Sequence, residues 1–409
     1  MKTKKVTFLN DPIYGFISIQ SPLIFKVISH PWFQRLRRIS QMGLSSLVYP
    51  GAHHTRFEHA LGGMHLMQEA IRVLRKKEVL ISDKEAESMQ LAILLHDIGH
   101  GPFSHTTEAT LAGIKSHEEI SLDLMKNLNE ELKGALDVAI AIFTNQYHKK
   151  FMHQLIVGQI DLDRMDYLKR DSFYSGATEG NINSKRIIEM MTVVDDQLAF
   201  EEKCIYSIEK FLMARRLMYW QVYLHKTSLS AEFLLVKILE RVRHCVENGI
   251  PPSLSPALGF FMSQKISKSD FSGDALENFL SLDDSDIIQG LKTWQYHDDF
   301  ILSRMSKMLI ERNLLKIKIQ TDPFDPSEVD LKIKQLKNFS FKESDYQNFV
   351  FTGSISNQTY VPLDKEILIL LKNGKLTSLQ EANPFFSSNE LSQIQVKYYL
   401  CYPRNTNLS

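Results

Sequence analysis

The sequence predicts a mainly α-helical protein, with a helical bundle core followed by a smaller mixed α+β C-terminal lobe. Apolar residues keep helical spacing through most of residues 32–250. Beyond about residue 255, short apolar runs alternate with Pro, Gly and Ser breaks, which is typical of strands mixed with helices. The 409 residues also exceed the ~250–300 at which single cores stop growing. We therefore predict two domains, 1–255 and 256–409, and expect an oligomerisation or regulatory role for the second.

The first domain begins with residues 1–31, which look extended because turn signals interrupt them. Ser82 and Glu85 form a capping box, so we predict a helix that runs through the apolar residues up to Leu95 and ends at Gly99. Ser116 and Glu119 form a second capping box, which predicts a helix with His117 in its first turn. Residues 205–246 predict one or two long helices, and a short hairpin is expected at 193–198.

In the second domain the signals are weaker. Apolar spacing predicts helices at 285–310 and 326–337. Short β-prone runs predict strands near 314–320, 347–352, 361–371 and 395–402. This domain contains no catalytic motif that we recognise.

Composition narrows the classes of function. Forty-eight basic residues balance 48 acidic ones, which argues against a protein that wraps long nucleic acid mainly through its charge. Three cysteines are too few and too scattered for a disulfide framework or a thiolate zinc site. No apolar run approaches the length of a membrane span, and the start of the chain lacks a secretory signal. We expect a cytoplasmic protein with no membrane partner.

Histidines concentrate in one part of the chain. Eight of the 14 fall between residues 53 and 117, where uniform scatter gives roughly two. Four polar groups with catalytic potential lie in HDIGHGPFSH (96–105), where adjacent His96 and Asp97 follow an apolar helix. An adjacent His–Asp pair can supply one nitrogen and one oxygen to the same ion. The alternative is a helix end whose His complements the helix dipole.

Two further segments offer matching groups. In RFEHALGG (56–63), Arg56 and His59 share a helix face, and the glycines leave room for a close approach. In DLDRMDYLKRD (161–171), Asp163, Tyr167 and Asp171 share a face, whereas Asp166 pairs with Arg170 in a structural role. Taken alone, each segment is better explained as a packed or solvated helix face.

Taken together, His59, His96, Asp97 and Asp163 make a set of two histidines and two carboxylates. Such nitrogen and oxygen ligation suits one transition metal ion, namely Fe, Mn, Zn, Ni or Co. A structural zinc site would instead contain thiolates.

The same residues carry a family resemblance. NDPIYG (10–15), FQRLRRISQMG (33–43), YPGAHHTRFEHALG (49–62), HDIGHGPFSH, SHEE (116–119) and DLDRMDYLKRD resemble the HD-domain phosphohydrolases. The order and spacing are most similar to the deoxynucleoside triphosphate (dNTP) triphosphohydrolase branch, which includes the SAM-and-HD-domain enzyme. The resemblance covers roughly residues 8–250, and no SAM domain is expected ahead of it.

The resemblance implies a role for individual residues. It implies that His59, His96, Asp97 and Asp163 are metal ligands and that His100, His105, His117 and Glu108 are catalytic. Position 108 is an Asp in the close relative. Substrate binding is implied for Gln41, Met42, Arg56, Arg164, Tyr167, Asp171, Arg215 and Tyr223, and effector binding for Asn10, Gln34 and Arg37.

The activity that the resemblance implies is water attack on the α-phosphorus of a dNTP, giving a deoxynucleoside and tripolyphosphate. His105 is our choice of general acid, and Mg would accompany the nucleotide. The implied partners are the dNTP substrate, a dNTP effector and further copies of the chain in a homodimer or homotetramer.

Two alternatives stay open at this point. The metal site could serve another nucleotide of the HD class, such as a monophosphate, a cyclic nucleotide or ppGpp. The chain could also be a non-enzymatic regulator that binds nucleotide or single-stranded nucleic acid.

Overall fold

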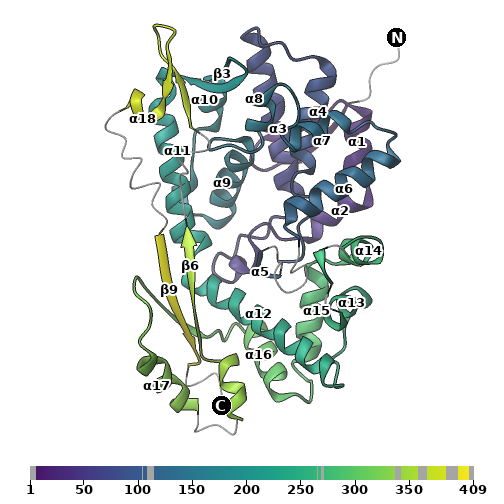
Figure 1. Ribbon diagram of the computed structural model, residues 1–409, viewed down its shortest axis with the longest axis vertical. Helices are drawn as coiled ribbons and strands as arrows, with labels where there is room; N and C mark the ends of the chain where they lie inside the picture. Colours follow the sequence, from purple (N-terminus) through teal and green to yellow (C-terminus); the bar gives the residue numbers. More distant parts are fainter. Residues whose placement is uncertain are drawn as a thin grey trace.

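Three helices form the centre of the first domain (Figure 1). The computed structural model describes residues 6–103, 105–107, 115–264, 266–268, 271–336, 342–357, 366–383 and 395–404, without the side chains of residues 105, 343, 344 and 357. Helix α3 (Arg56–Lys76) packs between α4 (Asp83–Leu95) and α9 (Leu162–Ser175), and most of its side chains are buried. The mainly α-helical fold with a smaller mixed C-terminal region is therefore confirmed.

Capping boxes start the helices that carry the site. Thr55 with Glu58 caps α3, and the predicted pairs Ser82–Glu85 and Ser116–Glu119 cap α4 and α6 (His117–Glu131). In each box the side chains satisfy backbone N–H groups that the helix leaves without partners. His117 accordingly lies in the first turn of its helix, as predicted.

The remaining elements of the first domain surround this centre. They are β1 (Thr7–Asp11), β2 (Gly15–Ile19), α1 (Pro22–Ile28), α2 (Pro31–Gln34), η1 (Arg35–Arg38), η2 (Gly43–Leu47), α5 (His105–Thr107), α7 (Asp137–Phe143), α8 (Lys150–Gln154), η4 (Thr178–Gly180), α10 (Ser184–Glu189), β3 (Met191–Val194), β4 (Gln197–Glu201), η5 (Glu202–Cys204), α11 (Ile205–Met218), η6 (Tyr219–Tyr223) and α12 (Lys226–Glu247). The hairpin near 193–198 and the two long helices in 205–246 are as predicted, with a π-helical turn, η6, between the helices.

One N-terminal prediction was wrong. Residues 22–28 form helix α1 rather than extended chain, because Ser21 caps the helix and Pro22 occupies its first turn. A proline in the first turn loses no helical hydrogen bond. We read Ser21-Pro22 as a turn signal, although the same dipeptide also starts helices.

The C-terminal region mixes helices with short strands. Its elements are α13 (Pro256–Ser263), α14 (Asp274–Ser281), α15 (Asp284–Trp294), α16 (Phe300–Ile310), β5 (Lys316–Gln320), α17 (Pro326–Leu336), η8 (Glu343–Asn348), β6 (Phe351–Asn357), β7 (Leu368–Leu370), β8 (Leu376–Ser378), α18 (Leu379–Ala382) and β9 (Gln395–Tyr402). Helices α13 and α14 and strand β8 were not predicted. Part of the strand expected at 361–371 lies outside the described residues.

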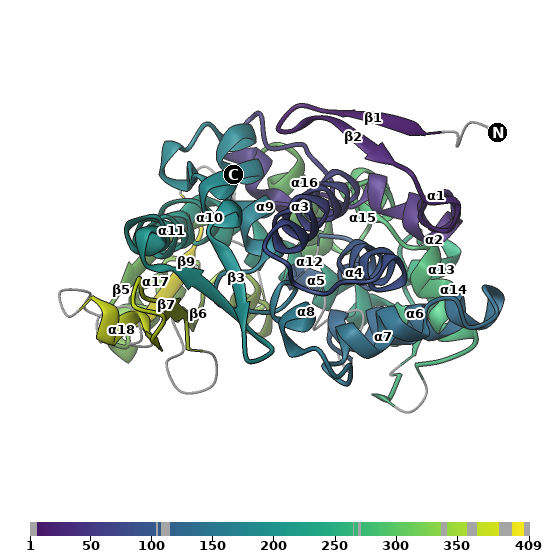
Figure 2. The same cartoon turned by 90° about the horizontal axis from the view of Figure 1, so that it is seen from above.

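The two predicted domains share sheets and core. Strand β7 pairs in parallel with β4 of the first domain, so one sheet has the order β3-β4-β7-β8, while β5-β9-β6 forms another. Helices α13 and α16 pack on α12, and Figure 2 shows C-terminal strands lying beside α11. The boundary at residue 255 stays a prediction. No described helix is both long and apolar enough to span a lipid bilayer.

Candidate metal centre and substrate pocket

Three helix ends bring the predicted metal ligands together. His59 lies in the first turn of α3, His96 caps the C-terminal end of α4 with Asp97 after it, and Asp163 lies in the first turn of α9. The N-terminal turn of α9 is fixed by Asp161, whose carboxylate accepts from the backbone N–H of Arg164 at 2.7 Å. Segments more than a hundred residues apart thus meet at one point.

The donor atoms of His59, His96 and Asp163 lie within 4.8 Å of one another, and Asp97 adjoins them. The Oδ1 of Asp163 lies 3.0 Å from the Nε2 of His59 and 3.3 Å from the Nε2 of His96. Asp97 oxygens lie 3.8 Å from the Nε2 of His59 and 3.4 Å from that of His96. Ligand atoms held about 2.0–2.2 Å from one ion stand roughly 3–3.5 Å apart, so these spacings suit a shared cation.

The imidazole hydrogen bonds test whether a metal fits. The Nδ1 of His59 lies 2.8 Å from Oδ2 of Asp166, and the Nδ1 of His96 lies 2.6 Å from the carbonyl oxygen of Ile93. Both Nδ1–H groups therefore donate to oxygen, which leaves the lone pair of each Nε2 facing the cluster. Neither buried Nε2 has a hydrogen-bond partner. Two aimed lone pairs beside two carboxylates form a donor set that a divalent cation satisfies.

The charges of the cluster also favour a cation. Burial lowers the pKa of both histidines, but the Asp163 and Asp166 carboxylates raise that of His59 to about 10. The Asp97 and Asp163 carboxylates raise the pKa of His96 to about 9. The carboxylates thus create a strong preference for positive charge at this point.

A second group adjoins the first through Asp97. Its Oδ1 lies 3.4 Å from the Nε2 of His100, and His117 belongs to the same cluster. The rings of His100 and His117 stack at 4.0 Å. Burial and the nearby Arg56 guanidinium lower the pKa of His100 well below its ordinary value, which favours the neutral ring. An imidazole that is readily neutral can accept or pass a proton beside the metal position.

A cavity of about 400 Å³ opens from this cluster. Cavities that hold small molecules commonly enclose about 300–1,000 Å³. Of the residues predicted to bind substrate or to act in catalysis, its lining includes Gln41, Met42, Arg56, His100, His117, Tyr167, Asp171 and Tyr223, together with the ligands Asp97 and Asp163. The cavity therefore has a metal-binding end and a wall of polar and aromatic side chains.

A hydrogen-bonded chain holds one wall of the cavity. Asp171 accepts from the Tyr223 hydroxyl at 2.7 Å through Oδ2, and its Oδ1 lies 2.7 Å from the Nε2 of His54. The ring of His54 is buried and stacks on Tyr174 at 4.4 Å, and the backbone carbonyl oxygen of His54 accepts from the backbone N–H of Gln41 at 3.0 Å. The carboxylate of Asp171 is consequently fixed on both sides.

The other residues predicted to bind substrate or to act in catalysis either do not line the cavity or lie outside the part of the chain that the structure describes. Arg164 pairs with Asp161 and donates to the carbonyl of Gly158 at 2.6 Å, and Arg215 is buried behind Tyr167. Neither belongs to the described lining of the cavity. The backbone of His105 forms part of α5, but its side chain, like the whole of Glu108, lies outside the described residues.

The predicted effector residues lie on the N-terminal surface. Arg37 donates to the side-chain oxygen of Gln34 at 2.9 Å and lies over the ring of Phe57 at 3.5 Å. Asn10 lies on β1, paired with Phe16 of β2.

Sequence reasoning missed three contributors. Asp166 pairs with Arg170 as predicted, at 2.9 Å, but it also orients His59. We gave His54 no role, and nothing in its spacing indicated that it would meet Asp171, 117 residues away. Glu232 of α12 lines the cavity, and burial raises its pKa to about 7. Asp166 lies about one helical turn after Asp163, and this spacing could have suggested that it orients a ligand as well as pairing with Arg170.

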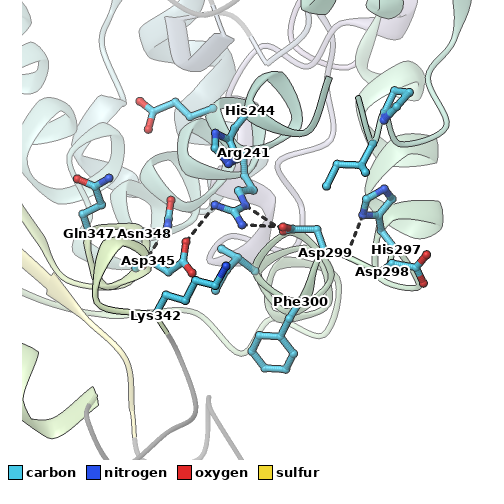
Figure 3. A pocket seen from close by; sticks show the side chains of 14 residues that line it. Arg241, His244, His297, Asp298, Asp299, Phe300, Lys342, Asp345, Gln347 and Asn348 are labelled. Atoms are coloured by element: carbon cyan, nitrogen blue, oxygen red, sulfur yellow. Dashed lines mark hydrogen bonds and ion pairs between the residues drawn. The ribbon is translucent and has the colours of Figure 1, made fainter. Parts of the chain in front are cut away.

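A larger cavity, of about 890 Å³, lies between α12, α16 and residues 342–348 (Figure 3). At its centre Arg241 donates to Asp299 at 2.6 and 2.9 Å and to Asp345 at 3.1 Å. The two carboxylates already neutralise this guanidinium, and the lining contains none of the metal-cluster residues in the described part of the chain. We therefore take the smaller cavity as the candidate active site.

The residues of the metal cluster fall within a segment that matches a known family model. Residues 56–171 match the HD domain model and residues 182–250 match the HD associated region. The chain is 32% identical over 99% of its length to the uncharacterized protein YwfO of Bacillus subtilis, of which it covers 94%. It is also 32% identical, over 57% of its length, to the deoxynucleoside triphosphate triphosphohydrolase SAMHD1 homolog of Dictyostelium discoideum, of which it covers 48%. Among solved structures, a phosphohydrolase from Bacteroides thetaiotaomicron matches with a TM-score of 0.94 and 49% identity, covering 98% of this chain and 100% of that one.

Proposed function

The chain belongs to the HD-domain family of metal-dependent phosphohydrolases, and we propose that it is a dNTP triphosphohydrolase that releases a deoxynucleoside and tripolyphosphate. One observation carries the proposal. The metal cluster opens into a cavity of about 400 Å³ whose other wall presents Gln41, Tyr167 and Asp171. A phosphate at the cluster would therefore extend into groups suited to a sugar and a base.

The metal end supplies the reaction centre. His59, His96, Asp97 and Asp163 would hold one ion, which we expect to be Fe, Mn, Zn, Ni or Co. When bound, such an ion polarises the α-phosphate and lowers the pKa of water. His100 has a lowered pKa and lies beside Asp97, so its ring could accept a hydrogen bond from the attacking water or donate one to a phosphate oxygen.

The leaving group needs a proton. As water forms a bond to the α-phosphorus, the bond from phosphorus to the 5′-oxygen breaks, and an unprotonated 5′-oxygen leaves poorly. We assign the proton donor as His105 and the residue that orients it as Glu108. His117, stacked on His100, would contact phosphate or water.

The cavity wall would select the sugar. Tyr167 would stack against the 2′-carbon and exclude a ribose hydroxyl by a clash, and Asp171 with Tyr223 would receive the 3′-hydroxyl. Gln41 and Met42 complete this wall. Arg56 would contact the phosphates with the help of a Mg ion. Arg164 and Arg215 are further phosphate contacts in the proposal, and Arg164 would exchange its Asp161 partner for phosphate.

The proposal extends to partners. A dNTP effector would bind at Asn10, Gln34 and Arg37 in a homodimer or homotetramer, and the enzyme would act in the cytoplasm, where dNTPs are found. The relative from Dictyostelium carries the deoxynucleoside triphosphate triphosphohydrolase name, which supports the substrate class.

Product identification tests the function. Purified protein would be incubated with each of the four dNTPs and Mn, and the products separated by ion exchange. We expect tripolyphosphate and deoxynucleoside from the wild-type protein, and loss of both with Asp163→Asn. Asp195→Asn, an exposed hairpin change, is the matched control and should retain activity. Release of orthophosphate, pyrophosphate or a monophosphate instead would contradict the proposal.

A further inference from the structure

The junction between α14 and α15, residues Leu282–Asp284, contacts η1 and loop 100–103 of the first domain. Arg35 joins them. Its Nε donates to the carbonyl oxygen of Leu282 at 2.7 Å, and its Nη1 donates to the carbonyl oxygen of His100 at 2.9 Å. The side chain is 1% exposed. One buried guanidinium therefore ties the C-terminal region to the loop that follows the metal ligands His96 and Asp97.

Asp284 makes a second and more direct connection. Its Oδ2 accepts from the backbone N–H of Ser40 at 2.8 Å, and its Oδ1 accepts from the backbone N–H of Phe103 at 2.8 Å. Ser40 precedes Gln41, and both Gln41 and Phe103 line the candidate active site. A single carboxylate thus holds two edges of the cavity that come from separate parts of the chain.

The backbone at Phe103 needs such support. Its φ of 49° lies in the left-handed region, which a residue with a side chain rarely adopts. Unfavourable conformations persist when the surrounding structure fixes them. The hydrogen bond from the N–H of Phe103 to Asp284 is one of the contacts that can hold this turn. Since His100 lies three residues before Phe103, the turn constrains the position of His100.

We propose that Asp284 is a positioning residue of the active site. It fixes loop 100–103 against segment 40–42, so that His100 at the metal end and Gln41 at the sugar end face the same substrate. The proposal rests on the proposed function, and it makes the C-terminal region a working part of the HD site rather than an appendage.

The test substitutes Asp284 in the full chain. Asp284→Asn keeps the shape but leaves only one acceptor oxygen, so one of the two N–H groups loses its partner. We expect kcat to fall roughly ten- to a hundredfold, as when catalytic groups are displaced by about 1 Å. Metal content per chain and the melting temperature should stay close to those of the wild type. Hydrogen exchange should accelerate in peptides covering 36–42 and 98–103.

Asp274→Asn is the matched control, because it removes the same charge from an exposed position on α14. Asp284→Ser is a second variant, which also retains one acceptor. If kcat of both Asp284 variants stays within about twofold of the wild type at equal metal content, the proposal is wrong. It is equally wrong if activity is lost only in proportion to the unfolded fraction. A wild-type protein without dNTPase activity would remove the proposed function, whereas the exchange comparison would still decide whether Asp284 fixes both segments.

Discussion

The Nδ1 of His59 lies 2.8 Å from Oδ2 of Asp166, and both side chains are fully buried. With a metal bound, this contact would keep the proton of His59 on Nδ1 and leave Nε2 to face the metal position. Asp166 is itself held by Arg170, whose guanidinium donates to both of its oxygens. The candidate metal ligand His59 is therefore held from behind by the ion pair between Asp166 and Arg170.

We predict that Asp166→Asn weakens metal binding by about 10–100-fold, because partners behind the ligands orient them and raise their basicity. The measurement is metal retention per folded chain against a graded chelator. Asp330→Asn, on the exposed face of α17, should bind as the wild type does. Equal retention in the Asp166 variant and the control would show that Asp166 only supports folding.

Gly62→Ala should also disturb the ion pair between Asp166 and Arg170, here through a steric clash. An added Cβ would lie 1.9 Å from Oδ1 of Asp166 and 2.4 Å from Nη2 of Arg170, so α9 would have to move away from α3. We expect a loss of about 1–3 kcal/mol in the free energy of unfolding, together with weaker metal binding. Denaturant titration measures the first effect.

Gly63→Ala is the matched control for that substitution. There the new Cβ would meet only the Ile93 side chain, at 3.3 Å, which needs a small adjustment. Alanine also favours helix over glycine, so this variant should be neutral or slightly stabilised. Equal destabilisation of both variants would argue against a special requirement for glycine at position 62.

His54→Asn should lower kcat/KM for a dNTP by about tenfold, because Asp171 loses one of the groups that fix it. The effect should depend on the 3′-hydroxyl. With a 2′,3′-dideoxynucleoside triphosphate the variant and wild-type values should lie close together. His53→Asn is the control, since His53 is exposed. An equal loss on both substrates would mean that Asp171 does not read the 3′-hydroxyl.

The lowered pKa of Glu85 predicts how part of the unfolding free energy changes with pH. Although burial opposes it, hydrogen bonds from Lys149 and from the N–H and hydroxyl of Ser82 lower the pKa of Glu85 from 4.5 to about 2. Since the folded state holds its proton more weakly than the unfolded state, Glu85 stabilises the fold above about pH 4.5. This contribution disappears as the pH falls toward 2.

Glu85→Gln should therefore lower the unfolding free energy at pH 7, and the gap to the wild type should close during acidification. Denaturant titrations at pH 7, 4 and 3 test this expectation. Glu130→Gln, at an exposed position on α6, should follow the wild type at each pH. A gap that stays constant with pH would contradict the assignment.

Local sequence signals predicted much of the helical core. The capping boxes at Ser82 and Ser116 act within one turn, so they can be read directly, and they place His96 and His117 correctly. The pairing of β4 with β7 could not be predicted, because it joins residues about 170 apart through short strands. The same reason hid His54–Asp171 and the two hydrogen bonds of Asp284, which depend on tertiary packing rather than on spacing.

Hydrolysis in ¹⁸O-labelled water tests the central claim most directly. The four-residue cluster should activate solvent against the innermost phosphate of a dNTP, so mass spectrometry should find one ¹⁸O atom in the tripolyphosphate and none in the deoxynucleoside. Label in orthophosphate, pyrophosphate or a nucleoside monophosphate would mean attack at another phosphorus or loss of pyrophosphate from the α-phosphorus, and label in the deoxynucleoside would place the attack at the 5′-carbon. Either result would contradict the account.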